Sequence, residues 1–169
     1  MSVEISSERY VMRELRLTDV TDRYLDWFSD REARRFIAAA AGTRELSDLK
    51  RFVEERIDRD DVLFLGIFEK ATHLHIGNIK YEPVDSDLGY AVMGVMIGDP
   101  AHRGKGITPE ILRASGEWLN ANRNIRHIVL GVHRENTGAI RAYEKAGFAI
   151  GPSPYVSPAP DSLTMVRAF

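Results

Sequence analysis

Three apolar, strand-like segments follow one another in the middle of the chain, and this run most constrains the fold. The segments are VLFLGIF from Val62, HLHIGNIKYEPV from His73 and LGYAVMGVMIG from Leu88. Short polar links at Lys70–Thr72 and Asp85–Asp87 separate them. Because links of this length join neighbouring antiparallel strands, the three segments are predicted to form one continuous part of a sheet.

Helical and strand-like segments flank this run on both sides, as hydrophobic periodicity and capping residues indicate. The predicted elements are a strand over 10–17, a helix capped at Thr18-Asp19, a short helix over 33–41, an amphipathic helix over 46–57, a helix over 107–122, a strand over 125–133, a helix from Asn136 to Gly147 and a final strand over 162–167. The proline-rich segment 151–160 is predicted to be a short edge strand that runs into a loop. This order predicts an α/β (α+β) fold with a mixed, mostly antiparallel sheet of about seven strands flanked by helices.

Length and composition narrow the class of protein. A chain of 169 residues fits a single domain over residues 1–169. It has no cysteine, which excludes a disulfide framework and favours a cytoplasmic protein. The net charge of −2 and the absence of a basic stripe argue against a nucleic-acid partner, and no apolar run approaches the roughly 20 residues of a membrane span. His73 and His75 alternate on one strand without a carboxylate at ligand spacing, so no metal site is expected.

A glycine-rich turn, Arg103-Gly104-Lys105-Gly106, lies between the third strand and the helix that starts at Ile107. The first turn of a helix leaves backbone N–H groups unpaired, so this junction predicts an anion-binding site. The spacing fits neither the Walker A motif nor the dinucleotide-binding fingerprint. Taken by itself, the turn is also compatible with a tight, solvated connection without a ligand.

Two motifs in register resemble the GNAT superfamily of N-acetyltransferases. The segment Ala101–Gly106 resembles its motif A, whose signature is Gln or Arg, two residues, Gly, any residue, and Gly or Ala; Ala101 departs from that signature. The segment NTGAIRAYEKAGF, Asn136–Phe148, resembles motif B at the expected distance. The segments YLDWFSDREARRFI and HIGNIKYEPVD resemble the branch that contains ribosomal-protein N-terminal acetyltransferases and nucleotide amino-sugar acetyltransferases. The resemblance covers nearly the whole chain.

The resemblance implies an acetyl-CoA-dependent N-acetyltransferase, with acetyl-CoA as co-substrate and direct transfer of the acetyl group to a primary amine. A protein N-terminus, an amino sugar and a small amine all remain open as acceptors. A non-catalytic acyl-CoA-binding regulatory module on the same fold is the alternative. A homodimer is also compatible with the family. The intact spacing from Asn136 to Tyr143 favours the enzyme.

The resemblance also assigns coenzyme and catalytic roles to particular residues. Tyr143 matches the motif B tyrosine that faces the coenzyme sulfur, and a phenol is a suitable acid for the departing thiolate; its alternative is a core position on an amphipathic helix. Gly94 and Gly98 are candidates for a bulge that splays the third strand from the next. The residues implied in coenzyme binding are Val95, Met96, Ile97, His102, Arg103, Gly104, Lys105, Gly106, Ile107, Asn136 and Tyr143.

The sequence does not identify the general base or the acceptor pocket uniquely. His133 and Glu82 are candidate bases, although each also fits an exposed histidine at a strand end and an edge carboxylate. Arginines beside aromatic residues suit an acceptor that carries phosphate or carboxylate, such as a nucleotide sugar; a solvated helix face with core aromatics explains them equally well. The acceptor-pocket candidates are Trp27, Arg34, Arg35, Phe36 and Tyr81.

Overall fold

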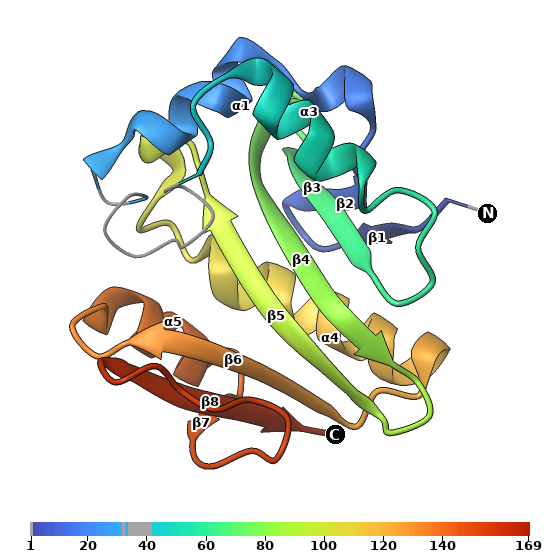
Figure 1. The fold of residues 1–169 in the computed structure, drawn as a ribbon, viewed down its shortest axis with the longest axis vertical. Helices are drawn as coiled ribbons and strands as arrows, with labels where there is room; N and C mark the ends of the chain where they lie inside the picture. The colour runs from blue at the N-terminus through green and yellow to red at the C-terminus, as the bar shows by residue number, and fades with distance from the viewer. Residues whose placement is uncertain (1, 32, 34–41) are drawn as a thin grey trace.

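The computed structural model describes residues 2–31, 33 and 42–169. Within these residues the strands form one sheet of eight in the order β1-β2-β3-β4-β5-β6-β8-β7 (Figure 1). The strands are β1 Glu4–Ser6, β2 Tyr10–Glu14, β3 Leu63–Glu69, β4 His75–Asp85, β5 Tyr90–Ile97, β6 His127–His133, β7 Ala149–Ile150 and β8 Ser162–Ala168. The predicted mixed sheet of about seven strands is thereby confirmed, and the short strands β1 and β7 extend it at its two edges.

The middle of the sheet is the run of β3, β4 and β5, which pair antiparallel as their short links predict. Strand β5 then pairs with β6 in parallel, so the connection between them crosses over the sheet. Helix α4, Ile107–Arg123, makes this crossover and lies behind β4 and β5 in Figure 1. The crossover places the N-terminus of α4 directly after the end of β5, where the glycine-rich turn lies.

Two hydrophobic cores cover the two faces of the sheet. One core holds α4 and α5, Thr137–Lys145, against side chains such as Ile79, Tyr81 and Ile111. The other holds α1, Asp22–Asp26, the 3-10 turn η2, Trp27–Ser29, and α3, Leu46–Glu54, against Met96 and Phe64. Figure 1 shows α1 and α3 together at one end of the central strands. The N-terminal helices and the later helices therefore lie on opposite faces.

The first helix starts later than the Thr18-Asp19 cap predicts. Thr21 is the residue that caps α1, because its Oγ1 accepts the Tyr24 N–H at 3.4 Å. Asp19 instead closes a 3-10 turn and pairs with Arg13, 2.7 Å between Asp19 Oδ1 and Arg13 Nη2. Asp19 is thus engaged in the turn that precedes the helix, and Thr21 provides the cap.

The end of the chain also differs in detail from the sequence prediction. The edge strand β7 occupies residues 149–150, and the proline-rich segment after it is a loop. Helix α5 follows the prediction, with Asn136 as its cap and Gly147 at a φ of +93° after its end. The short helix expected over 33–41 lies outside the described residues except for Ala33. Among the helices that the structure describes, none is long and apolar enough to cross a membrane.

Candidate functional site

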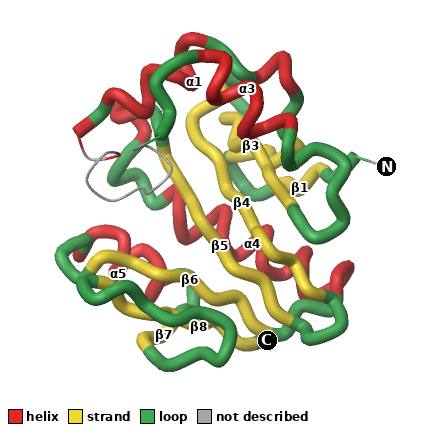
Figure 2. The backbone as a smooth tube through the Cα atoms, viewed as in Figure 1, coloured by secondary structure: helices red, strands yellow, loops and turns green. Residues whose placement is uncertain are grey.

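Strands β5 and β6 diverge toward their carboxyl ends. Their parallel pairing stops at Val92 and Val129, whereas β5 remains paired with β4 as far as Ile97 (Figure 2). The edge of β5 that faces β6 is therefore unpaired beyond Val92, and alternate backbone N–H and C=O groups point into the gap. The expected bulge at Gly94 and Gly98 is not what opens this gap, because the register with β4 is unbroken at Gly94 and neither glycine marks a shift.

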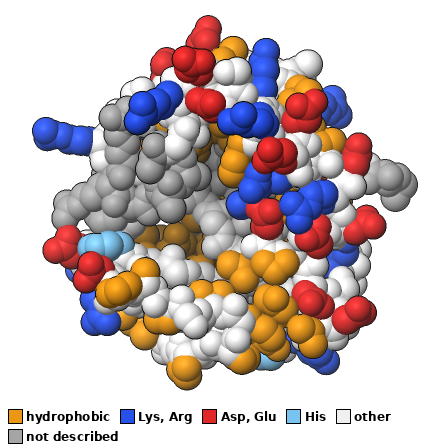
Figure 3. Space-filling view, viewed as in Figure 1, with side chains coloured by type: hydrophobic (Ala, Val, Ile, Leu, Met, Phe, Trp, Pro, Cys, Tyr) orange, Lys and Arg blue, Asp and Glu red, His pale blue; other side chains and the backbone are white. Residues whose placement is uncertain are grey.

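A cleft of about 810 Å³ occupies this divergence, and Figure 3 shows the surface hollowed there. Its volume lies within the range of about 300–1,000 Å³ that small-molecule sites occupy. Most residues that the sequence predicts for the site line it, from four separate segments of the chain. These lining residues are Val95, Met96, Ile97, His102, Arg103, Gly104, Gly106, Ile107, His133, Asn136 and Tyr143.

The glycine-rich turn has the backbone conformation that an open helix N-terminus requires. Gly104 and Gly106 have φ values of +73° and +71°, a region that side chains with a Cβ rarely adopt. Gly106 is the cap position of α4 and offers no side chain to the first-turn N–H groups, which are left to the cleft. Arg9 holds the turn from outside, since its Nη1 donates to the Lys105 carbonyl at 3.0 Å. Lys105 itself does not line the cleft.

Arg103 and His102 line the cleft, and other protein groups lie close to both side chains. The Arg103 Nε donates to the Ile97 carbonyl at 3.0 Å, and its Nη1 lies 2.7 Å from Asp30 Oδ2. His102 Nδ1 lies 3.1 Å from Asp99 Oδ2. Partial burial, the largest single influence, raises the pKa of Asp30, but the hydrogen bond and charge of Arg103 together with backbone N–H donors outweigh it and the pKa is lowered. Arg103 therefore ties the turn to the end of β5 and to the segment after η2.

Helix α5 contributes Asn136 and Tyr143 to the opposite wall. The Asn136 Oδ1 caps the helix by accepting the Ala139 N–H at 3.3 Å. Tyr143 packs beside Phe148, with 6.1 Å between ring centroids. Burial raises the pKa of the Tyr143 phenol to about 12. The phenol is consequently protonated throughout the neutral and moderately alkaline range, so it can donate a proton but cannot serve as a base.

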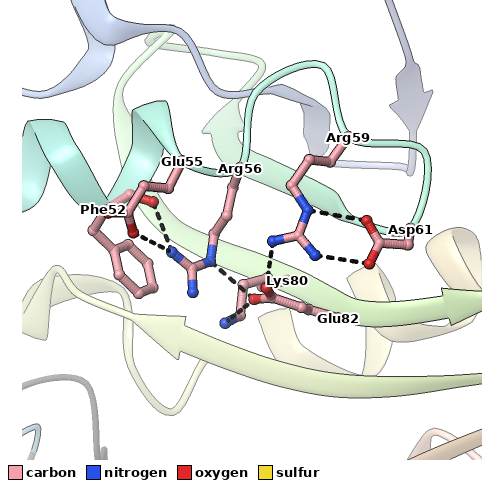
Figure 4. Close-up of polar contacts among 7 residues, drawn as sticks. All are labelled: Phe52, Glu55, Arg56, Arg59, Asp61, Lys80 and Glu82. Carbon is pink, nitrogen blue, oxygen red and sulfur yellow. Dashed lines mark hydrogen bonds and ion pairs between the residues drawn. The ribbon is translucent and has the colours of Figure 1, made fainter.

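The two candidate bases have different surroundings. His133, at the end of β6, lines the cleft and its Nδ1 accepts the Glu135 N–H at 3.2 Å. Glu82 does not line the cleft and is held by three cations, shown in Figure 4: Lys80 at 2.7 Å, Arg56 at 2.8 Å and Arg59 at 3.3 Å. Burial alone raises the pKa of Glu82, but the bonds from Lys80 and Arg56 outweigh it and the pKa is lowered. A carboxylate stabilised in this way is a weak base.

Two of the acceptor-pocket candidates are corrected by the structure. Tyr81 is fully buried on the opposite face of the sheet, where its hydroxyl lies 2.7 Å from Ser115 Oγ of α4. Trp27 is buried against Gly98, with ring centroids 4.9 Å from His75 and 5.0 Å from Tyr24. Neither lines the cleft, because Tyr81 faces α4 and the Trp27 ring is packed on Gly98. The other three candidates, Arg34, Arg35 and Phe36, lie outside the described residues.

Other residues, which the sequence interpretation missed, line the end of the cleft under α1 and α3. They are Tyr24, Phe28, Phe52, Phe64, Asn78 and Lys80. Alternation along β4 was the available signal for two of them: Asn78 and Lys80 share one face, and Ile79 and Tyr81 share the other. The aromatic residues carry no such signal, because they come from separate segments that meet only in the folded chain.

Among the described residues, no group of three or more His, Cys, Asp or Glu side chains is placed to hold a metal ion. The arrangement within the cleft is an open helix N-terminus, an unpaired strand edge and a buried phenol. Such a set can bind an anionic, extended ligand and give a proton to a leaving group.

Several solved structures of acetyltransferases have the same fold as this chain. The solved structure of RimL, the ribosomal L7/L12 α-N-protein acetyltransferase in complex with coenzyme A, has a TM-score of 0.84 at 15% identity and covers 98% of both chains. A GNAT-family acetyltransferase from Bacillus anthracis has a TM-score of 0.81 at 17% identity, also over 98% of both chains. The microcin C7 self-immunity acetyltransferase MccE, in complex with acetyl-CoA and AMP, has a TM-score of 0.80 at 14% identity over 96% of this chain and 93% of that one. At these identities the likeness establishes the fold.

Sequence comparison adds relatives in two organisms. The probable N-acetyltransferase YjcK of Bacillus subtilis (strain 168) is 33% identical over 96 residues, which are 56% of this chain and 52% of that protein, so the match spans about half of YjcK's length. An N-acetyltransferase 9-like protein of Caenorhabditis briggsae is 25% identical over 155 residues, 85% of this chain and 76% of that protein. The family model described as an acetyltransferase (GNAT) domain matches residues 9–149 and includes both motifs. By that match, the chain belongs to the GNAT acetyltransferase family.

Proposed function

We propose that the protein is an acetyl-CoA-dependent N-acetyltransferase that moves an acetyl group directly to a primary amine. The observation that carries the proposal is the cleft itself, which joins the open N-terminus of α4, the unpaired edge of β5 and the Tyr143 phenol. The relatives named as N-acetyltransferases and the GNAT structures with acetyl-CoA or coenzyme A support it.

The residues present fit the coenzyme. Its diphosphate suits the first turn of α4, because the turn at Gly104 and Gly106 has no Cβ to obstruct the backbone N–H groups. Its extended pantetheine arm suits the unpaired backbone edge of β5 from Val95 to Ile97, and Asn136 lies across the gap on α5. Ala101 supplies no side-chain donor, and Arg103 is engaged with Asp30 and the end of β5, so backbone groups carry the binding.

The bound coenzyme supplies the acetyl thioester, and the chain supplies the other requirements of the transfer. A C–N bond forms and the C–S bond breaks, so the carbonyl oxygen gains negative charge, the amine loses a proton and the sulfur gains one. Backbone N–H groups at the edge of β5 stabilise the charge on oxygen. Tyr143 gives its proton to the sulfur, and its raised pKa keeps the phenol protonated until the thiolate forms. His133, which lines the cleft, takes the proton of the amine through water.

The proposal is tested by measuring release of free CoA from acetyl-CoA with three pools of acceptors, namely peptides with free N-termini, nucleotide amino sugars and small amines, with mass spectrometry of the acetylated product. Transfer to a member of one pool is the expected result. Tight acetyl-CoA binding by the folded protein with no transfer in any pool contradicts the enzyme and supports the acyl-CoA-binding regulatory module instead.

A further inference from the structure

Building on the proposed function, we propose that the acceptor amine belongs to a molecule that also carries an anionic oxygen group, a carboxylate or a phosphate, and a flat apolar part. The anion binds the Asn78 amide and the Lys80 ammonium group, and the apolar part packs against Phe52 and Phe64. Polycationic acceptors are thereby disfavoured. The four residues lie together at the end of the cleft beneath α1 and α3.

Asn78 presents a buried donor that has no partner. Its side chain is only 4% exposed, and its Oδ1 lies 2.7 Å from His75 Nε2. Burial lowers the pKa of His75, so the neutral ring donates its proton to that oxygen. The Nδ2 group of Asn78 has no hydrogen-bond partner among the described residues, although the side chain lines the cleft. A buried amide without a partner is costly, and an oxygen of a bound ligand satisfies it.

Lys80 lies two residues further along the same face of β4. Its partner on β5 is Gly94, and a Cβ built at Gly94 meets nothing within 4 Å. The space next to Lys80 on this face of the sheet is therefore open. The carboxylate nearest to Lys80 is Glu82, which it shares with Arg56 and Arg59 (Figure 4). Arg56 and Arg59 are also paired with Glu55 and Asp61. Of these charged groups only Lys80 lines the cleft, so the network presents a cation to the cleft while its carboxylates lie outside the lining.

Phe52 and Phe64 form an apolar corner next to Lys80. Their ring centroids are 5.8 Å apart with planes at 88°, and both residues line the cleft. The Lys80 ammonium nitrogen lies 5.2 Å from the Phe52 ring centroid. The Arg56 guanidinium covers the same ring at 3.8 Å and holds it in place. A flat apolar group therefore has two aromatic surfaces within reach of the cation.

The charged residues that line the cleft also favour an acceptor that carries an anion. Among the described residues that line it, the charged side chains are Lys80, Arg103, Arg141 and Lys145, and none is an aspartate or glutamate. A spermidine-like or aminoglycoside-like acceptor brings several positive charges and would meet these cations and no carboxylate among the described lining residues. An acceptor with an anion near its amine reduces that repulsion.

The test compares amines that differ only in the anion. The pairs are phenylalanine with phenethylamine for carboxylate, and 2-aminoethyl phosphate with ethanolamine for phosphate; spermidine represents the polycations. For each protein the kcat/KM of the anionic member is divided by that of its partner, and the ratios of variants and wild type are compared, so differences in amine basicity cancel. The variants are Lys80→Met, Lys80→Glu and Asn78→Leu, with Lys50→Met on the exposed face of α3 as the matched control.

The expected result is a ratio that falls at least tenfold in Lys80→Met and Asn78→Leu for one or both pairs, falls further in Lys80→Glu, and is unchanged in Lys50→Met. The pair that responds identifies carboxylate or phosphate. A preference of the wild type for spermidine, or a ratio that Lys80→Met does not change, overturns the acceptor class while the acetyltransferase stands. Absence of transfer to every amine, with acetyl-CoA binding shown by calorimetry, contradicts the enzyme itself. Thermal unfolding of each variant verifies that it is folded.

Discussion

Gly98→Ala tests how closely the N-terminal helices are packed onto the end of β5. A Cβ at Gly98 would come under 3.0 Å from three ring atoms of Trp27, a separation that real Cβ atoms do not show. The ring cannot yield easily, because Trp27 is 4% exposed and lies between Tyr24 and His75. The φ of Gly98 is not in the left-handed region, so the effect of alanine comes from space alone.

Overpacking of this kind costs about 1–3 kcal/mol, which for a chain of this size lowers the Tm by about 2–12 °C. Gly94→Ala, within β5 just before Gly98, is the matched control, because its Cβ meets nothing within 4 Å. Replacing a strand glycine with alanine stabilises by roughly 0.5–1 kcal/mol, so the control is expected to raise the Tm by about 1–4 °C.

The assay is thermal unfolding followed by circular dichroism, with urea midpoints as a second measure. In a Trp27→Leu background the Gly98→Ala change is expected to lose most of its cost, since the overlapping ring atoms are gone. A Gly98→Ala protein that melts at or above the wild-type temperature would refute the packing argument. An equal cost in both backgrounds would show that Trp27 is not its source.

Two further predictions concern buried polar side chains. Tyr81→Phe is expected to cost about 1 kcal/mol in urea unfolding and to leave acetyl transfer unchanged, because its hydroxyl contacts Ser115 on the far face of the sheet; reduced turnover at intact stability would return Tyr81 to the acceptor pocket. Burial lowers the pKa of His75 below its ordinary 6.5, so the unfolded chain takes up this proton first and stability falls as the pH drops below 6.5. His75→Phe, which keeps the stack on Phe68, should therefore flatten the change in urea midpoint between pH 7.5 and 5.5, and equal slopes would contradict that role.

The order of elements was predictable because it depends on local patterns. The short links between the central strands imply antiparallel pairing, and Asn136 and Gly147 mark the two ends of α5. The start of α1 was not predictable from the capping residues alone, because it also depends on an ion pair with the preceding strand. Asp19 is drawn to Arg13 of β2, which no capping pattern reveals.

In the candidate site, too, the residues that follow local sequence patterns were predictable and those that depend on contacts in the folded chain were not. The coenzyme side lies in two continuous motifs, so its residues could be named from the sequence, and most of them line one cleft. The acceptor side depends on which face of the sheet a side chain occupies. Tyr81 and Lys80 are adjacent in sequence, yet one is in the core and the other lines the cleft. Trp27 is taken up by packing on Gly98, a contact between segments far apart in the chain.

The most direct test of the proposed enzyme is the initial rate of CoA release from acetyl-CoA with an amine that the wild type acetylates, measured side by side for wild type and Tyr143→Phe. The account predicts that kcat falls by about 10²-fold or more in Tyr143→Phe, as loss of a general acid implies. The Kd for acetyl-CoA and the Tm are expected to stay close to the wild-type values. Unaltered turnover in Tyr143→Phe would contradict the assignment of the proton donor, and absence of any amine-dependent release by the wild type would contradict the enzyme.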